Sequence, residues 1–250
     1  MKLQKTINLI IAALFVLALP VHASSGKAHW TYEGHEGPEH WGDLSPDYQL
    51  CKDGKQQSPI DITGAQAAKL DKIKFSYKAS AKEIINNGHS IQVNMNKGSS
   101  ITLGGKTYNL LQFHFHSPSE HTFDGKPADM VAHFVHQAKD GQLGVVAVSM
   151  KKGKANKTLA GLWKHMPAKA GEQKKLSGKL NINGLMPRSK TYYNYPGSLT
   201  TPPCSEGVNW IVLKDQIEVS AEQVAAFTAL FPISVRPVQP LNDRVIKVSQ

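Results

Sequence analysis

The sequence predicts a single domain that is mainly β, with a few short helices (α+β). Short alternating or apolar runs, typical of strands, recur at 84–85, 90–95, 100–103, 110–116, 130–137, 143–150 and 209–213. The turn pairs Asn87-Gly88, Asp124-Gly125 and Asp140-Gly141 stand between such runs, where hairpins would turn. No internal repeat and no linker rich in Pro, Gly or Ser divides the chain after residue 23, so residues 24–250 are expected to form one domain.

Two segments have helical spacing instead. The first carries apolar residues at positions 159, 162, 163 and 166. The second begins with Ser220 and Gln223, which form a capping-box pattern ahead of apolar residues at 224, 227, 230 and 231. Pro232 follows directly and is expected to end that helix.

The first 23 residues are interpreted as a secretory signal peptide. Lys2 and Lys5 precede the apolar run Leu9–Leu19, and Val21-His22-Ala23 is a small-x-small cleavage site. The alternative is a membrane anchor, but a bilayer needs about twenty apolar residues and this run is much shorter. We therefore expect an exported chain that does not insert into the membrane after cleavage.

Export changes the interpretation of the cysteines. Cys51 and Cys204 are the only two in the chain, and in an oxidising compartment they are expected to form one disulfide. Such a bond would contribute about 4–5 kcal/mol on the chain-entropy model, because it closes a long loop. The alternative is a pair of free, buried thiols.

The charge balance makes nucleic acid a candidate partner, because the chain has a net charge of +10. Only Arg188, Arg236 and Arg244 are arginines, however. Lysine lacks the planar fork that recognises phosphates and base edges. We therefore expect a solvated lysine surface and no nucleic-acid partner.

Three histidines form the most informative pattern. His114 and His116 alternate with Phe113 and Phe115, so on a strand both imidazoles face one side, with Cα atoms about 7 Å apart. If Asp124-Gly125 centres a hairpin, His133 lies directly opposite His116, on the same face. Three converging imidazoles match a catalytic zinc site with an open fourth position, although copper and iron also accept such ligands.

The motifs along the chain resemble those of the α-class carbonic anhydrases. They include Gly37–Trp41, Gln57–Asp61, Asn86–His89, Gln112–His116, Ser119–His121, His133–His136, Tyr195–Pro203 and Arg236-Pro237. They follow in order over the whole expected mature chain. The short connections and the cysteine pair are similar to those of the secreted, periplasmic bacterial branch.

The resemblance implies a twisted, largely antiparallel central sheet with Zn²⁺ held by His114, His116 and His133. It implies reversible hydration of CO₂ to bicarbonate and a proton, inhibition by sulfonamides, and a minor esterase activity. Catalytic zinc is known to lower the pKa of its water to about 7, which supplies the attacking hydroxide. The working protein would be a periplasmic monomer or homodimer.

The resemblance also assigns roles to polar residues. Thr200 would accept a hydrogen bond from the hydroxide and donate its own proton to Glu120. His89 would shuttle protons, since an ordinary histidine pKa near 6.5 suits loading and unloading around neutrality. Tyr32 and Gln92 would order the intervening water, and Gln112 would orient His114.

Apolar residues are expected to form the pocket for CO₂. Val135 and Val145 have the parity of the zinc-facing side of their strands. By resemblance, Leu199, Thr201 and Trp210 complete the pocket wall.

One position departs from the family pattern. Two residues before the third ligand, the family usually carries a glutamate that hydrogen-bonds the imidazole, but this chain has Val131. Loss of such a partner typically costs 10–100-fold in metal affinity or activity. We therefore expect weaker zinc retention, unless Asp129 or a backbone carbonyl substitutes.

Two other functions remain open on the sequence alone. A catalytically inactive relative could act as a binding module, although such proteins usually lack a zinc histidine. A dedicated zinc hydrolase of esters is the other, but no Gly-x-Ser-x-Gly nucleophile elbow is present.

Overall fold

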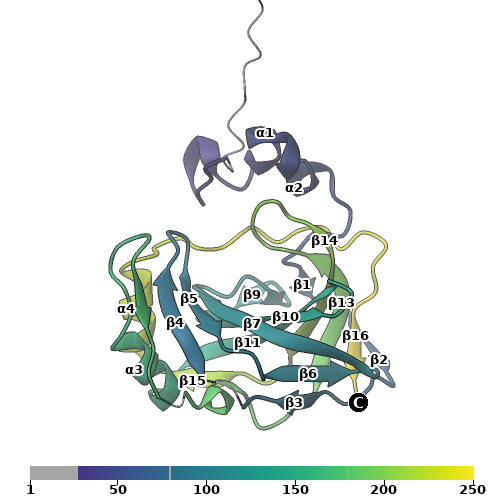
Figure 1. Ribbon diagram of the computed structural model, residues 1–250. Helices are drawn as coiled ribbons and strands as arrows, with labels where there is room; N and C mark the ends of the chain where they lie inside the picture. The colour runs from purple at the N-terminus through teal and green to yellow at the C-terminus, as the bar shows by residue number, and fades with distance from the viewer. Residues whose placement is uncertain (1–27, 79, 179) are drawn as a thin grey trace, which may run out of the picture.

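The structure, a computed structural model, describes residues 28–78, 80–178 and 180–250. One large, strongly twisted sheet forms the body of the protein, and short helices lie around it (Figure 1). The predicted signal peptide lies outside the described residues. None of the helices in the described segments is long and apolar enough to cross a membrane.

The large sheet has thirteen strands, and most of its ladders are antiparallel, as expected. Its main path runs β12 (Gln173–Lys175), β4 (Ala81–Asn86), β5 (Ile91–Met95), β7 (Lys106–His116), β10 (Met130–Ala138), β11 (Leu143–Lys152), β14 (Glu206–Leu213), β13 (Tyr192–Ser198), β16 (Lys247–Ser249), β2 (Gln66–Ala68). Three further strands lie off this path: β3 (Lys74–Ser76), β6 (Ser100–Leu103) and β15 (Ile217–Val219). The sheet is mixed, because β11 runs parallel to β14 and β15, and β16 runs parallel to β2.

A separate small sheet contains β1 (Asp61–Ile62), β8 (Thr122–Phe123) and β9 (Lys126–Pro127). The helices are α1 (Trp41–Leu44), α2 (Leu50–Asp53), α3 (Lys157–Trp163) and α4 (Ala221–Thr228), with 3₁₀ turns at Gly34–Glu36, Pro46–Tyr48 and Ile182–Leu185. The predicted capping box is confirmed: the Ser220 hydroxyl accepts from the Gln223 N–H, and the Gln223 side chain accepts from the Ser220 N–H. The helix ends at Thr228, so the apolar residues at 230 and 231 lie beyond it.

All seven predicted strand runs fall in observed strands, but several strands were not predicted. β2, β3, β12 and β16 have only three residues each, too few for a periodicity to emerge. β13 contains Pro196 and Gly197, which are unfavourable inside strands, yet it pairs with β14 along its length. Tertiary pairing overrides local propensity there.

The predicted register of the histidine strands is wrong by two residues. Asp124-Gly125 does turn a hairpin, but that hairpin joins the short strands β8 and β9, with Phe123 opposite Lys126. Irregular segments separate it from β7 and β10, which pair with His133 opposite His114 rather than His116. A shift of two residues preserves the face, so all three imidazoles still lie on one side.

Strand β10 is buried on both faces, which explains its nearly continuous apolar sequence. Phe134 packs with Phe113 in the main core. Val131 and Val135 belong to a second apolar cluster on the opposite face, where His133 also lies. The three predicted ligands therefore lie on an apolar face of the sheet rather than on a solvated surface.

Strand β10 carries a second histidine, His136, which is buried and has no part in the predicted site. Its Nδ1 donates to the carbonyl of Gly144 at 3.2 Å, and its Nε2 accepts from the Tyr77 hydroxyl at 2.9 Å. Both nitrogens are thus satisfied in the neutral tautomer. Burial lowers the pKa of His136 to about 4.

This burial should make the fold sensitive to acid. The pKa of His136 is lower in the folded chain than in the unfolded chain. Below about pH 6.5, unfolding therefore takes up a proton, and the free energy of unfolding falls as the pH drops toward 4. His136→Gln should therefore reduce the loss of unfolding free energy between pH 7 and pH 5 by about 2 kcal/mol. Urea unfolding at the two pH values measures this difference.

The control is His165→Gln, because that side chain is exposed in the folded protein. This variant should retain the full pH dependence of the parent. An unchanged pH dependence in His136→Gln would contradict the prediction.

Candidate metal centre

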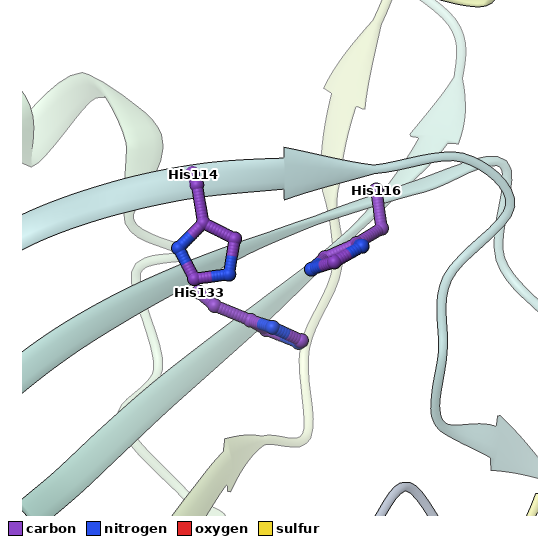
Figure 2. A group of neighbouring side chains, drawn as sticks. All are labelled: His114, His116 and His133. Atoms are coloured by element: carbon purple, nitrogen blue, oxygen red, sulfur yellow. The ribbon is translucent and has the colours of Figure 1, made fainter. Parts of the chain in front are cut away.

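The three predicted ligands converge in space. His114 and His116 extend from β7 and His133 from the neighbouring β10, with their rings turned toward a common point (Figure 2). The ring centroid of His114 lies 5.1 Å from that of His116 and 5.5 Å from that of His133. The centroids of His116 and His133 are 4.9 Å apart. One nitrogen from each ring lies within 4.8 Å of the others, a spacing that one metal ion can bridge.

Hydrogen bonds fix the outer nitrogens of two ligands. His114 Nδ1 lies 2.9 Å from Gln112 Oε1, which confirms the predicted contact between these side chains. His116 Nδ1 lies 2.5 Å from the carbonyl oxygen of Ser234, which can only accept, so this nitrogen carries the proton. Both arrangements leave Nε2 with a free lone pair, as a metal ligand requires.

Burial keeps the imidazoles of His114 and His133 in their neutral form. The pKa values of His114 and His133 lie well below the ordinary value, first because burial penalises the cation and second because of repulsion from neighbouring histidines. Metal ions bind neutral imidazole, so little energy is spent on removing protons at neutral pH.

His133 differs from the other two ligands in its partners. Its Nδ1 and His116 Nε2 both lie near Glu120 Oε2, at 3.7 and 3.5 Å, so these two nitrogens face the same space. Its Nε2 is buried and has no hydrogen-bond partner among the described residues. Val131 precedes it by two positions on the same face and offers no polar atom.

Asp129 does not replace the missing partner. Its carboxylate accepts from the Lys152 N–H at 2.7 Å and forms an ion pair with the Lys152 ammonium. Nearby, the ring of His121 lies 6.1 Å from that of His133, and its Nδ1 is also unpartnered within the described segments. His133 Nε2 therefore has neither a carboxylate nor a carbonyl acceptor within the described residues.

Glu120 is a buried carboxylate at the centre of the polar network. The Arg236 N–H donates to its Oε1 at 3.1 Å, and the Thr200 side chain lies beside it. Burial raises its pKa, while His116, Thr200 and Arg236 oppose that shift. The structure thus brings Glu120 and Thr200 together beside the ligands.

Arg236 supports this region, although its sequence motif did not indicate how. Its guanidinium donates to Gln57 Oε1 at 2.8 Å, to the Ser58 carbonyl at 2.9 Å and to the Cys51 carbonyl at 2.8 Å. Burial lowers its pKa to about 10, which still leaves it cationic at neutral pH. It joins the segment from Cys51 to Ser58 to its own loop, whose backbone donates to Glu120.

Other supporting residues also escaped prediction. The Ser234 carbonyl carries no signal in the sequence, because any residue supplies one and its partner lies far away along the chain. The Tyr195 hydroxyl is hydrogen-bonded to His121 Nε2 at 2.6 Å and to the Ser58 hydroxyl at 2.9 Å. All three residues belong to the motifs named above, but only the structure shows that they are in contact.

The predicted pocket residues lie together on one side of the ligands. Val135 pairs with Val145 across β10 and β11, and Val145 is aligned with Trp210 across β11 and β14. Leu199 packs against the same cluster. Thr201 lies in the adjoining loop, where its carbonyl accepts from the Cys204 N–H at 2.9 Å.

His89 lies apart from the ligands, at the β4–β5 turn. Its ring stacks on Trp30 with centroids 3.6 Å apart and a 10° interplanar angle. Both rings line a cavity of about 600 Å³ together with Pro202 and Pro203 of the loop beyond Thr201. Burial and the nearby His29 lower the pKa of His89.

The two predicted water-ordering residues lie between these regions. Gln92 is opposite His114 in the β5–β7 ladder and donates to Asn94 at 2.7 Å. The Tyr32 hydroxyl is buried, with no hydrogen-bond partner in the described part of the chain, and its pKa is raised by burial and by Glu120.

The predicted disulfide between Cys51 and Cys204 is present, with Cα atoms 5.0 Å apart. It ties α2 to the loop that follows Thr200 and Thr201. The Gln57 amide also donates to the Cys204 carbonyl at 3.1 Å. Loop and N-terminal segment are therefore held together by covalent and polar contacts.

The donor set fits zinc. It comprises three imidazoles, two of them oriented by other residues, and apolar walls and the neighbouring Thr200 and Glu120 lie beside them. Three protein ligands leave a coordination position open for water and substrate, which is the arrangement of a catalytic rather than a structural zinc site.

Comparisons with known proteins agree with this interpretation. The eukaryotic-type carbonic anhydrase family matches residues 36–250. The chain is 42% identical over 247 residues to a carbonic anhydrase of Pectobacterium carotovorum, covering 98% of this chain and 99% of that protein. It is 43% identical over 249 residues to one of Neisseria gonorrhoeae, covering 98% of each.

Solved structures give the same result. The α-carbonic anhydrase of Thermovibrio ammonificans, in complex with the inhibitor sulfanilamide, superposes with a TM-score of 0.87 at 48% identity, covering 90% of this chain and 100% of that one. The α-carbonic anhydrase of Photobacterium profundum gives 0.83 at 42% identity, covering 89% and 100%.

A twisted mixed sheet that carries three histidines on adjacent strands defines this protein as a zinc enzyme of mainly β architecture. The chain belongs to the carbonic anhydrase family, in its α class. It is a carbonic anhydrase with Zn²⁺ as cofactor and CO₂ and bicarbonate as substrates. The inactive alternative is not favoured, because all three ligand histidines are present and convergent.

The unpartnered nitrogen of His133 yields a prediction about metal retention. Val131→Glu would place a carboxylate beside the buried His133 Nε2 and give it an acceptor. Zinc release should slow by about 10- to 100-fold, the usual effect of such a partner. Transfer of zinc to a chromogenic chelator measures the off-rate.

Val131→Leu serves as the control, since it changes the volume at this position and adds no acceptor. Its off-rate should remain close to that of the parent. An off-rate in Val131→Glu that is unchanged or faster would show that His133 does not lack a partner.

Proposed function

We propose that the chain hydrates CO₂ reversibly at a centre formed by His114, His116 and His133, and that it does so outside the cytoplasm. The observation that carries this proposal is the convergence of three imidazoles beside the buried Thr200 and Glu120. Zinc, when bound there, lowers the pKa of water to about 7 and so supplies hydroxide at neutral pH.

Thr200 and Glu120 would orient the nucleophile. Thr200 lies beside Glu120 and would donate its only hydroxyl proton to that carboxylate, so its oxygen could only accept a further hydrogen bond. A nucleophile that carries a proton can donate to that oxygen and thereby aims its lone pair at the substrate. Ligands with no proton to donate would meet the oxygen's lone pairs and be disfavoured.

Val135, Val145, Leu199 and Trp210 would receive CO₂. These side chains belong to one apolar cluster, and Thr201 of the adjoining loop would border it. CO₂ has no net dipole and is weakly hydrated. Little free energy is therefore lost when it leaves water for an apolar wall. Bicarbonate is charged and would leave such a wall readily.

His89 would carry the proton between the centre and solvent. It lines a cavity together with Trp30, where a neutral imidazole could accept a proton from the centre and release it to solvent. Tyr32 and Gln92, which lie near Glu120 and His114, would order the water between His89 and the ligands.

We also propose that residues 1–23 are a signal peptide and that residues 24–250 act as one catalytic domain in the periplasm. The disulfide supports an oxidising location. The domain would act as a monomer or homodimer, without inserting into the membrane. A minor esterase activity would arise from the same nucleophile.

Stopped-flow CO₂ hydration tests the main proposal. The zinc-loaded chain should be active, lose its activity to a chelator, regain it with added zinc, and be inhibited by sulfanilamide, with which the Thermovibrio relative was crystallised. His116→Ala, which removes one ligand, should be inactive and should retain less zinc. No activity in the zinc-loaded parent would overturn the proposal.

The shuttle role of His89 predicts a selective defect. His89→Ala should lower the maximal turnover by about 10²-fold or more in dilute buffer, because proton export becomes limiting. A small imidazole buffer should restore much of the rate, while kcat/KM for CO₂ changes less. His35→Ala, at an exposed position, is the matched control.

An equal loss of turnover in both variants, or no loss in His89→Ala, would argue against a shuttle at this position. Failure of imidazole to restore the rate would instead indicate a structural role for the Trp30–His89 stack.

A further inference from the structure

The positive charge of this chain is concentrated in one short segment. Residues 151–179 contain nine lysines and one glutamate, whereas the other 221 residues contain twenty basic and eighteen acidic side chains. Two of those twenty, Lys2 and Lys5, belong to the proposed signal peptide. Outside this segment the proposed mature chain is therefore electrically balanced.

Six of these lysines lie along α3, the segments on either side of it and the edge strand β12, a region that we call the basic face: Lys154, Lys157, Lys164, Lys169, Lys174 and Lys175. All six are exposed. Lys157 begins α3 and Lys164 directly follows its end, so a separation of seven residues puts them on nearly the same side of the helix. The opposite side of α3 buries Leu159 and Leu162.

The rest of the basic face continues along the edge of the sheet. The segment after α3 runs beside β4, because the Asn86 side chain donates to the Pro167 carbonyl and the Gly171 N–H donates to the Asn86 carbonyl. It then enters β12, the edge strand that pairs with β4 and carries the last two lysines. Figure 1 places α3 and β4 at one side of the molecule and β16 and β2 at the other.

Acidic groups neutralise little of this charge. Within the described residues, none of the six lysines forms an ion pair; the nearby pair, between Lys152 and Asp129, lies outside the basic face. Lys175 lies opposite Glu83 in the β12–β4 ladder. The carboxylate of Glu172 accepts from the Lys169 backbone N–H at 3.1 Å.

Protection of the sheet edge explains only part of this arrangement. Lysines on an edge strand discourage pairing with other chains, which accounts for Lys174 and Lys175. Lys154, Lys157, Lys164 and Lys169 lie outside any strand, so edge protection does not require them. A row of unpaired cations on a rigid surface is instead suited to a polyanionic partner.

The chemistry of the basic face favours lipid headgroups over nucleic acid. Residues 151–179 contain no arginine, the side chain best suited to fixed, bidentate phosphate and base contacts. Lysine is a point charge that needs no such fixed geometry, so it suits headgroups that move laterally in a fluid layer. The neighbouring Trp163 is anchored in the fold, with its Nε1 donating to the Gln223 carbonyl, and is not available for insertion.

We propose that the basic face docks the protein onto a membrane surface rich in anionic phospholipids, without inserting into it. The proposed export brings the chain to such a surface. In the docked state α3 and β12 face the headgroups, and the segment with α1 and α2, which Figure 1 shows at another side of the molecule, does not. The attraction is electrostatic, so it depends on ionic strength.

Vesicle co-sedimentation tests this proposal with the purified chain. Vesicles of phosphatidylcholine and phosphatidylglycerol (about 2:1) should bind the protein at about 50 mM salt and release it at about 500 mM, as screening shortens the range of the attraction. Vesicles of phosphatidylcholine alone should not bind it. Duplex DNA at the same salt serves as the competing polyanion.

Three variants isolate the charge of the basic face. Changing Lys154, Lys157, Lys164 and Lys169 together to Gln should weaken binding by more than about tenfold. Changing the same four to Arg keeps the charge and should preserve binding. The matched control changes four exposed lysines elsewhere to Gln: Lys69, Lys126, Lys139 and Lys247.

The control variant removes the same total charge and should keep most of the binding. All variants should retain CO₂ hydration in solution, because none of the changed residues lies at the metal centre. The proposal is overturned if the parent does not bind the anionic vesicles, or if it binds neutral vesicles equally well. It is also overturned if the control variant loses as much binding, if the Arg variant loses binding, or if DNA binds more tightly than the vesicles.

Discussion

The antiparallel pairing of β7 with β10 is the constraint on which the metal centre depends. Alternation along β7 puts His114 and His116 on one face, and the ladder sets His133 opposite His114. A slip of one residue would turn His133 into the main core and bring Phe134 to the site. The register is held because Phe134 packs on Phe113 on the other face, so the core and the metal centre require the same pairing.

Around this pairing, a buried polar network makes the geometry specific. Glu120 lies near two ligands and Thr200 and accepts from the Arg236 backbone, while the Arg236 side chain reaches Gln57 and the α2 segment. Removing one member would leave a buried charge without compensation, which costs more than the contact itself contributes. The network therefore links ligand geometry to the integrity of distant segments.

Much of this protein was predictable from its sequence because the informative residues lie close together along the chain. The alternation of residues 112–116 gave the shared face, and Ser220 with Gln223 gave the start of α4. The hairpin register was wrong because a local turn signal cannot reveal that Asp124-Gly125 belongs to a separate short hairpin. The Ser234 carbonyl and the His121–Tyr195–Ser58 chain depend on contacts between distant segments, which no local pattern encodes.

The contact between His116 and Ser234 has a consequence for how the enzyme matures. The carbonyl that orients this imidazole is synthesised 118 positions after its partner. A nascent chain possesses all three ligand histidines long before it possesses that carbonyl or Arg236. The support of the metal ligands is therefore completed only after residues 234–236 have been added and have packed against β7.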